Sequence, residues 1–224
     1  MTQTWNDLLF AHWPVEPDSL RPLVPAQLML DQFEGKCWVA VAPFHMTNVR
    51  GRAMPRIPGL SRFPELNVRT YVTVGNQPGV YFFSLDAANR AAVWAARSVY
   101  KLPYFYARMK VESDGDLIRY RSHRVGTAAE FRAQYRPIGP VLQRNKGTRE
   151  HWLTERYCLY TVSEANVYQA EIHHVPWPLQ DAEARIESNS MSAAAQIPLS
   201  ESAPLLHFAK KLDVLIWPLR KLSG

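Results

Sequence analysis

The segment FPELNVRTYVTV, residues 63–74, carries polar side chains whose types and spacing could recognise a small organic acid. At the two-residue period of a strand, Glu65, Asn67, Arg69, Tyr71 and Thr73 share one side and apolar residues share the other. A guanidinium binds a carboxylate bidentately, a carboxyl group exchanges a proton, and a phenol donates a hydrogen bond. Glu65 could pair with Arg69 along this face. The polar row is therefore either solvated surface or the lining of a binding site.

A second polar row occurs in YFYARMK, where Tyr104, Tyr106, Arg108 and Lys110 share one side of a predicted strand. Aromatic rings interspersed with charged groups are typical of a concave small-molecule site, whose walls are apolar and whose few polar groups orient the ligand. An exposed edge strand is the alternative interpretation. In LTERYCLYT, Arg156 follows Glu155, and this pair is either a surface feature or a buried ion pair.

Other catalytic signatures are absent from the sequence. It contains no glycine-rich phosphate loop, no G-x-S-x-G, no H-E-x-x-H and no C-x-x-C. His173 and His174 are neighbours, and adjacent side chains of a strand point to opposite faces, so they cannot share an ion. We therefore predict no metal and no cofactor. One of these histidines could act as an acid or base near neutral pH.

The elements that must position these residues are mainly strands. Runs rich in branched and aromatic residues are CWVAVAPF, LNVRTYVTV, GVYFFSLD, YFYARMKVE, DLIRYRSHR, RYCLYTV and VYQAEIHH. Two hairpins are predicted: Met109–Val111 turns through ESDGD into Leu117–Tyr120, and Leu159–Val162 turns through SEAN into Val167–Ala170. The spacing favours a largely antiparallel sheet or barrel.

Three helices are predicted. In SLDAANRAAVWAARSVYKLP, Asp86 caps a helix whose apolar stripe spans Ala88–Val99, and Pro103 ends it. DSLRPLVPAQLMLD has room for a turn or two of helix before its prolines interrupt it. Residues 205–216 are predicted to form a final helix that Pro218 closes.

The amino-acid composition limits the expected number of domains and the expected location of the protein. A chain of 224 residues with 47% hydrophobic residues is expected to fold as one domain over residues 1–224. We find neither a signal-peptide pattern nor a run of 18 apolar residues, so we expect a cytoplasmic protein with no membrane span. Cys37 and Cys158 fall in predicted strands and are expected to be reduced thiols.

Charge supports two alternative functions. The net charge is +6 and the pI is about 9.4, which permits binding to nucleic acid or an anionic surface, with RYRSHR as the candidate segment. The charges are interleaved with acids, so no specific nucleic-acid partner is expected. A basic, amphipathic helix over residues 205–224 would alternatively favour a peripheral-membrane role, if it did not pack on the sheet.

Several blocks together resemble one protein family over nearly the whole chain. They are HWPVEPDSLRPLVPAQLMLD, ELNVRTYV, GVYFFSLDAANRAAVWAARSVYKLPYFYARM, LTERYCLYT and HHVPWPL. The sequence is similar to the YqjF-like proteins, a bacterial family within the acetoacetate decarboxylase-like superfamily. The resemblance implies an α+β fold, mainly antiparallel β: a conical β-barrel with flanking helices and an internal cavity. It would turn the polar row inward, and it makes a homodimer an expectation.

The sequence departs from the decarboxylases where their lysine forms a Schiff base with a keto acid. ARSVYKLPYFYA keeps Arg97 and Pro103 but places Tyr104 and Phe105 where the two lysines would stand, and Lys101 lies three positions earlier. Schiff-base decarboxylation is therefore not expected.

The resulting hypothesis is a cavity that binds a small organic acid or keto compound. It assigns Tyr104 and Glu65 as the catalytic pair and five further residues as ligand-binding. These residue types fit a lysine-independent hydratase, dehydratase or isomerase, and they fit a pure binding protein as well. The ligand-binding residues are Arg69, Asn67, Tyr71, Arg97 and Tyr106.

Overall fold

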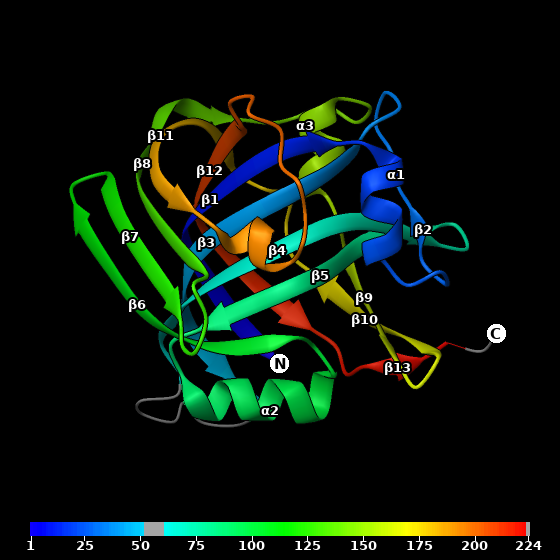
Figure 1. Cartoon of the computed structure of the whole chain (residues 1–224). Helices are drawn as coiled ribbons and strands as arrows, with labels where there is room; N and C mark the ends of the chain where they lie inside the picture. Colours follow the sequence, from blue (N-terminus) through cyan, green and yellow to red (C-terminus); the bar gives the residue numbers. More distant parts are fainter. Residues whose placement is uncertain (52–60, 223–224) are drawn as a thin grey trace.

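The computed structural model describes residues 1–51 and 61–222, which form one extensive sheet with a few short helices (Figure 1). The strands are β1 (Thr2–Val15), β2 (Met29–Leu30), β3 (Cys37–Arg50), β4 (Phe63–Val74), β5 (Gln77–Ala87), β6 (Tyr104–Asp114), β7 (Leu117–Arg124), β8 (Glu130–Leu142), β9 (Cys158–Ser163), β10 (Asn166–His173), β11 (Leu179–Asn189), β12 (Leu205–Ile216) and β13 (Arg220–Lys221). The helices are α1 (Pro17–Leu20), the 3-10 turn η1 (Arg21–Leu23), α2 (Arg90–Tyr100), α3 (Arg149–Thr154) and α4 (Met191–Ala194). The antiparallel β-rich class is confirmed, and so are both predicted hairpins, β6–β7 and β9–β10.

The sheet closes on itself into a ring. From β5 it continues through β6, β7, β8, β11, β12, β1 and β3 to β4, and β4 pairs back with β5. β9 and β10 cross this ring, because β9 pairs with β5 and β10 pairs with the end of β12. Only the β5–β6 and β5–β9 pairings are parallel among those of the described strands. The crossing encloses a smaller ring of β1, β3, β4, β5, β9, β10 and β12.

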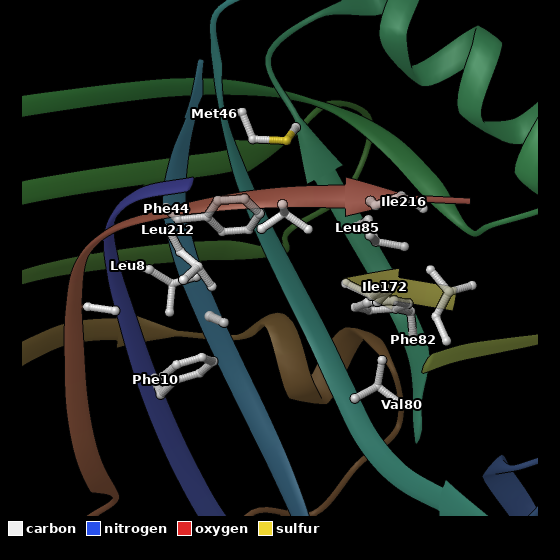
Figure 2. Close-up of a cluster of buried hydrophobic side chains, with 14 of the residues drawn as sticks. Leu8, Phe10, Phe44, Met46, Val80, Phe82, Leu85, Ile172, Leu212 and Ile216 are labelled. Carbon is white, nitrogen blue, oxygen red and sulfur yellow. The ribbon is translucent and has the colours of Figure 1, made fainter. Parts of the chain in front are cut away.

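Two apolar clusters lie on opposite faces of β1, β3 and β4. The cavity-side cluster lies on the inner side of the smaller ring. It includes Leu8, Phe10, Phe44, Phe82, Leu85, Ile172, Leu212 and Ile216 (Figure 2). The second cluster lies between the same strands and β7–β8, and includes Leu9, Val41, Leu66, Val68, Tyr120, Phe131 and Phe208. Both faces of β4 are therefore buried from Glu65 to Val72, so its polar row does not face water.

The close approach of β9 to β5 depends on Gly79. A Cβ atom built at this glycine would lie 2.7 Å from the carbonyl oxygen of Cys158 and 2.7 Å from a ring carbon of Tyr160. Real Cβ contacts are not this short, because the atoms would overlap. The absence of a side chain at this position therefore permits the crossing that encloses the smaller ring.

The predicted C-terminal helix is wrong. Residues Leu205–Ile216 form β12, which pairs with β1 along most of its length. Leu212, Val214 and Ile216 are buried while Asp213 and Leu215 are exposed, the two-residue alternation of a strand. The apolar spacing fits both periods, and pairing between two neighbouring strands decided the outcome. The helix that would support a membrane-surface role is therefore not formed, and residues 223–224 lie outside the described residues.

The predicted central helix exists, but its cap was misplaced. α2 begins after Asn89, whose side chain accepts a hydrogen bond from the Ala92 amide at 3.0 Å. Asp86 is instead part of β5. The helix ends at Tyr100, and Lys101 then adopts a left-handed conformation. The N-terminal turn of helix is confirmed by α1 and η1. Within the described residues, no helix is long and apolar enough to cross a bilayer.

We predict that Gly79→Ala destabilises the protein by about 1–3 kcal/mol, because the added methyl group forces β9 away from β5. Urea unfolding monitored by fluorescence would measure the change in the free energy of unfolding. Asn76→Ala, in the exposed turn before β5, is the matched control and should change stability by less than about 0.5 kcal/mol. Equal stability of Gly79→Ala and wild type would show that β5 and β9 can separate freely.

Candidate functional site

A cavity of about 320 Å³ lies inside the smaller ring, and α2 forms part of its wall. Its lining is mostly apolar. The lining residues that are labelled in Figure 2 include Leu8, Phe44, Met46, Phe82, Leu85 and Ile172. The polar residues in the lining are Gln3, Arg50, Glu65, Asn67, Arg69, Tyr104, Thr154, Arg156 and His174. Apolar walls with a few polar groups are the usual composition of a small-molecule site.

Glu65 and Tyr104 form a hydrogen-bonded pair in this cavity. The Tyr104 hydroxyl donates to Glu65 Oε2 at 2.9 Å. β4 supplies the carboxyl group and β6 supplies the phenol, which lie side by side because β5 pairs with both strands. The predicted pairing of Glu65 with Arg69 is wrong: among the described residues, no ion pair joins them, and the carboxyl group is held by Tyr104 instead.

Burial changes the acid–base properties of this pair. It raises the pKa of Glu65 from 4.5 to about 8, and the Asp86 carboxylate contributes in the same direction, while the Tyr104 hydrogen bond opposes it. Burial and the neighbouring Glu65 raise the pKa of Tyr104 well above its usual value. At neutral pH the pair therefore holds a proton on each partner. Such a pair can donate hydrogen bonds to a ligand oxygen.

A buried ion pair between β5 and β7 lies near Glu65. Arg124 of β7 binds Asp86 of β5 through Nε and Nη2, with the shortest contact 2.7 Å, and both side chains are buried. The Arg124 guanidinium also lies 4.0 Å from the ring centroid of Phe105. Tyr120 of β7 donates to the Glu65 carbonyl oxygen at 2.7 Å. These contacts fix the β4 and β5 backbone around the Glu65–Tyr104 pair.

Arg69 is a buried cation without an anionic partner. Its side chain is 7% exposed, and no carboxylate of the described residues lies within ion-pair distance of it. Its Nε atom is buried with no hydrogen-bond acceptor. The guanidinium lies 5.0 Å from the ring centroid of Phe10 and 5.9 Å from that of Tyr71, which offers partial compensation through the ring faces.

A second guanidinium in the cavity wall is paired. Arg156 Nη1 donates to Asp31 at 2.6 Å and Nε donates to the Trp152 carbonyl oxygen at 2.7 Å, while Nη2 is buried with no partner. Its guanidinium lies 5.1 Å from the ring centroid of Tyr71. Arg69 and Arg156 therefore approach the same ring, which places two guanidinium groups at this end of the cavity. The Glu155–Arg156 pairing considered from the sequence does not form, because Arg156 binds Asp31.

Tyr71 and His12 form a buried pair next to the Arg69 and Arg156 guanidinium groups. Tyr71 is fully buried, and its hydroxyl lies 2.7 Å from His12 Nε2. Burial lowers the pKa of His12 well below its usual value, and the nearby Arg69 lowers it further, so the imidazole is neutral. Tyr71 is not in the cavity lining. Its ring centroid lies close to both guanidinium groups, at 5.9 Å from that of Arg69 and 5.1 Å from that of Arg156.

The remaining predicted residues have different positions. Asn67 lines the cavity, and its side-chain oxygen is buried without a hydrogen-bond partner. Tyr106 is half-buried beneath the Arg90 guanidinium at 4.6 Å, outside the cavity lining. Arg97 is exposed on α2 and does not line the cavity either. Arg108 and Lys110 are exposed, so the second polar row reaches the site only at Tyr104.

Two further cavity residues lie in the segment HHVPWPL: His174, one of the two histidines considered from the sequence as an acid or base, and Trp177, which sequence reasoning missed. His174 is buried, and its Nδ1 lies 2.7 Å from the Val175 carbonyl oxygen. Trp177 is also buried, with an indole N–H that lacks an acceptor. No periodic signal marks them, because they follow β10 in an irregular segment. Among the described residues, no cluster of three metal-binding side chains occurs.

The basic segment RYRSHR forms β7 and is divided between two environments. Arg124 is buried against Asp86, whereas Arg121 and His123 are exposed and Arg119 lies 3.7 Å from Asp114. Cys37 and Cys158 are free and buried, as expected. The exposed cations are interleaved with acids on neighbouring strands, for example Arg136 with Glu183. No contact here singles out a polyanion as partner.

The closed sheet and its cavity define the class of protein, because solved structures share the whole fold. Acetoacetate decarboxylase from Legionella pneumophila aligns with a TM-score of 0.67 and 12% identity over 99% of this chain and 87% of that one. The enduracididine biosynthesis enzyme MppR, complexed with pyruvate, aligns with a TM-score of 0.70 and 11% identity, covering 99% and 90%. An acetoacetate decarboxylase-like enzyme from Sphingomonas wittichii RW1 aligns with a TM-score of 0.66 and 14% identity, covering 100% and 93%. The fold is thus acetoacetate decarboxylase-like.

Sequence similarity then identifies the family. The chain belongs to the family DUF2071, described as "Uncharacterized conserved protein (COG2071)", whose profile matches residues 2–213. It is 55% identical over 224 residues to the "Uncharacterized protein YqjF" of Bacillus subtilis (strain 168), covering all of this chain and 93% of that protein. The resemblance seen in the sequence is confirmed.

We predict that Glu65 makes stability fall as pH rises. Its folded-state pKa of about 8 lies above the unfolded value, so the folded state holds a proton that the unfolded state releases between about pH 4.5 and 8. Glu65→Gln removes this effect. The stability of Glu65→Gln relative to wild type should therefore increase with pH through this window, by at most about 1.4 kcal/mol per pH unit.

Urea unfolding of both proteins at pH 5, 6.5 and 8 would measure that difference. Glu112→Gln is the matched control, because Glu112 is exposed on β6 and should show no such rise with pH. A stability difference between Glu65→Gln and wild type that stays constant across the window would contradict a raised Glu65 pKa.

Proposed function

We propose that the cavity binds a small organic acid or keto compound whose carboxylate pairs with Arg69. The observation that carries this proposal is a buried guanidinium that has no carboxylate partner among the described residues and lies in a mostly apolar cavity. Burying an uncompensated charge costs several kcal/mol, so folded proteins rarely retain one without a function. A carboxylate ligand would supply the missing anion and accept hydrogen bonds from the guanidinium.

The Glu65–Tyr104 pair suits proton transfer to or from a bound ligand. A protonated pair donates hydrogen bonds to a carbonyl or hydroxyl oxygen, and a carboxyl group with a pKa near 8 can exchange a proton close to neutral pH. Hydration, dehydration or isomerisation would need only this chemistry. MppR, which shares the fold, has been captured with pyruvate, and this supports a ligand of the organic-acid class.

Schiff-base decarboxylation is not proposed, because no lysine lines the cavity within the described residues. Tyr104 lies at the position that the sequence comparison gave to a lysine. Lys101 is exposed beyond the end of α2, with its ammonium group 5.4 Å from the ring centroid of Tyr168. Covalent attachment of a keto acid would require an amine inside the cavity.

We predict that Arg69→Met abolishes acid binding without loss of stability in the free protein. Methionine has a similar length and removes the unpaired charge, so the ligand-free variant should be at least as stable as wild type. The measurement is a thermal-shift screen of carboxylic, keto and hydroxy acids. A ligand at a hundred times its dissociation constant stabilises wild type by about 2.7 kcal/mol, which raises the melting temperature by several degrees.

Arg97→Met is the matched control, because Arg97 is exposed on α2 outside the cavity. It should keep the response of wild type to every acid. If Arg69→Met were markedly less stable than wild type and no acid shifted either protein, Arg69 would be a structural residue and the proposal would fail.

We also predict that borohydride does not trap a keto acid on this protein. Incubation with pyruvate or acetoacetate and sodium borohydride, followed by mass spectrometry of the intact chain, should leave the mass unchanged. The control is a parallel reaction without borohydride. A stoichiometric adduct mapped to one lysine would show that an amine reaches the ligand and would overturn the lysine-independent mechanism.

A further inference from the structure

The two polar groups on which the proposed function rests lie at different places along β4. Glu65 and Arg69 are four residues apart on one strand, so their backbone positions are separated by about 13 Å. Tyr104 and Asp86 are the groups that shift the pKa of Glu65, and Arg69 is not among them. The carboxyl–phenol pair and the free guanidinium therefore act as separate sites within one cavity.

The wall between these two places is mostly apolar, and Asn67 is the polar residue between them on β4. Leu8, Phe44, Leu85, Ile172 and Ile216 all line the cavity and belong to the cavity-side cluster. Figure 2 shows this cluster extending from Phe10 and Val80 at one end to Met46 at the other. Phe10 is the ring that the Arg69 guanidinium contacts. The apolar wall thus leads away from Arg69 toward Met46.

α2 contributes small side chains to the far end of the cavity. Ala91, Ala92, Ala95 and Ala96 line it together with Val99, at the spacing of one helix face. Val99 is 63% exposed and also lines the cavity, so the cavity reaches the surface beside α2. Alanine leaves space that a larger side chain on the same face would fill.

From this geometry we infer that the ligand is an amphipathic monocarboxylic acid rather than a three- or four-carbon acid. Its carboxylate binds Arg69, and its hydrocarbon body follows the apolar wall past Tyr104 and Glu65 to α2. A volume of about 320 Å³ equals the share of about ten water molecules in the liquid, so an acid of about ten non-hydrogen atoms fills it. This inference rests on the proposed function and specifies its ligand class.

The inference predicts that binding affinity depends on the length of the acid's hydrocarbon chain. Each methylene that enters the apolar cavity tightens binding about fourfold, which corresponds to ~0.8 kcal/mol. Titration calorimetry with straight-chain saturated acids of four to twelve carbon atoms, kept below their micelle concentrations, would give the dissociation constants. Affinity should increase with each carbon to an optimum at about eight carbons, because that acid has about ten non-hydrogen atoms. The alcohol of the same length should bind at least about tenfold more weakly, because it lacks the charge that Arg69 needs.

Ala96→Leu tests the place where the hydrocarbon ends. Leucine keeps the helix and fills the space beside α2, so the optimum should move to acids about two or three carbons shorter. Ser98→Leu adds the same side chain at an exposed position of α2 that does not line the cavity, and it should leave the optimum unchanged.

The outcomes separate this inference from the proposed function. If four-carbon acids bind as tightly as eight-carbon acids and Arg69→Met abolishes both, the acid site stands and the inference about its ligand class fails. An optimum that Ala96→Leu leaves unchanged also overturns it. If no acid binds at any length, the proposed function fails with it. The chain-length series on wild type decides the question even if Ala96→Leu does not fold.

Discussion

The burial of both faces of β4 is the constraint on which the rest of the structure depends. One face packs against β7 and β8 through Leu66 and Val68, and the other turns into the smaller ring. A polar row on such a strand has no access to bulk water, so each member needs a partner within the protein or from a ligand. Glu65 is hydrogen-bonded to Tyr104 and Tyr71 to His12. Asn67 and Arg69 each have a buried side-chain atom without a hydrogen-bond partner.

The presence or absence of a hydrogen-bond or ion-pair partner separates the supporting residues from the candidate ligand contacts. Tyr71 completes its hydrogen bond inside the core, and Arg156 is held by Asp31. Arg69 contacts the ring of Phe10 and the ring and hydroxyl of Tyr71, which compensate a guanidinium weakly compared with a carboxylate. The fold thus retains a charge that costs stability. In a mostly apolar cavity, that charge would give a bound acid a preferred orientation.

Part of the architecture was predictable because its signals are local. Both hairpins follow from turn residues between alternating strands, and the polar row follows from two-residue periodicity in residues 63–74. The helix expected over residues 205–216 was wrong because its apolar spacing suits either period, and only β1 beside it selects a strand. Asp86 fits a helix cap in the sequence, yet Arg124, distant in the chain, holds it within β5.

The sequence by itself determined the family, the strand-rich class and the polar row, because each is a matter of residue type and near spacing. Only the tertiary structure decided that the row faces inward, that Glu65 binds Tyr104 rather than Arg69, and that Arg97 stays outside. It also brought His174 and Trp177 into the cavity wall. The physical reason is that ring closure joins strands that are far apart in the chain. Which polar groups meet, and which remain without a partner, depends on that closure.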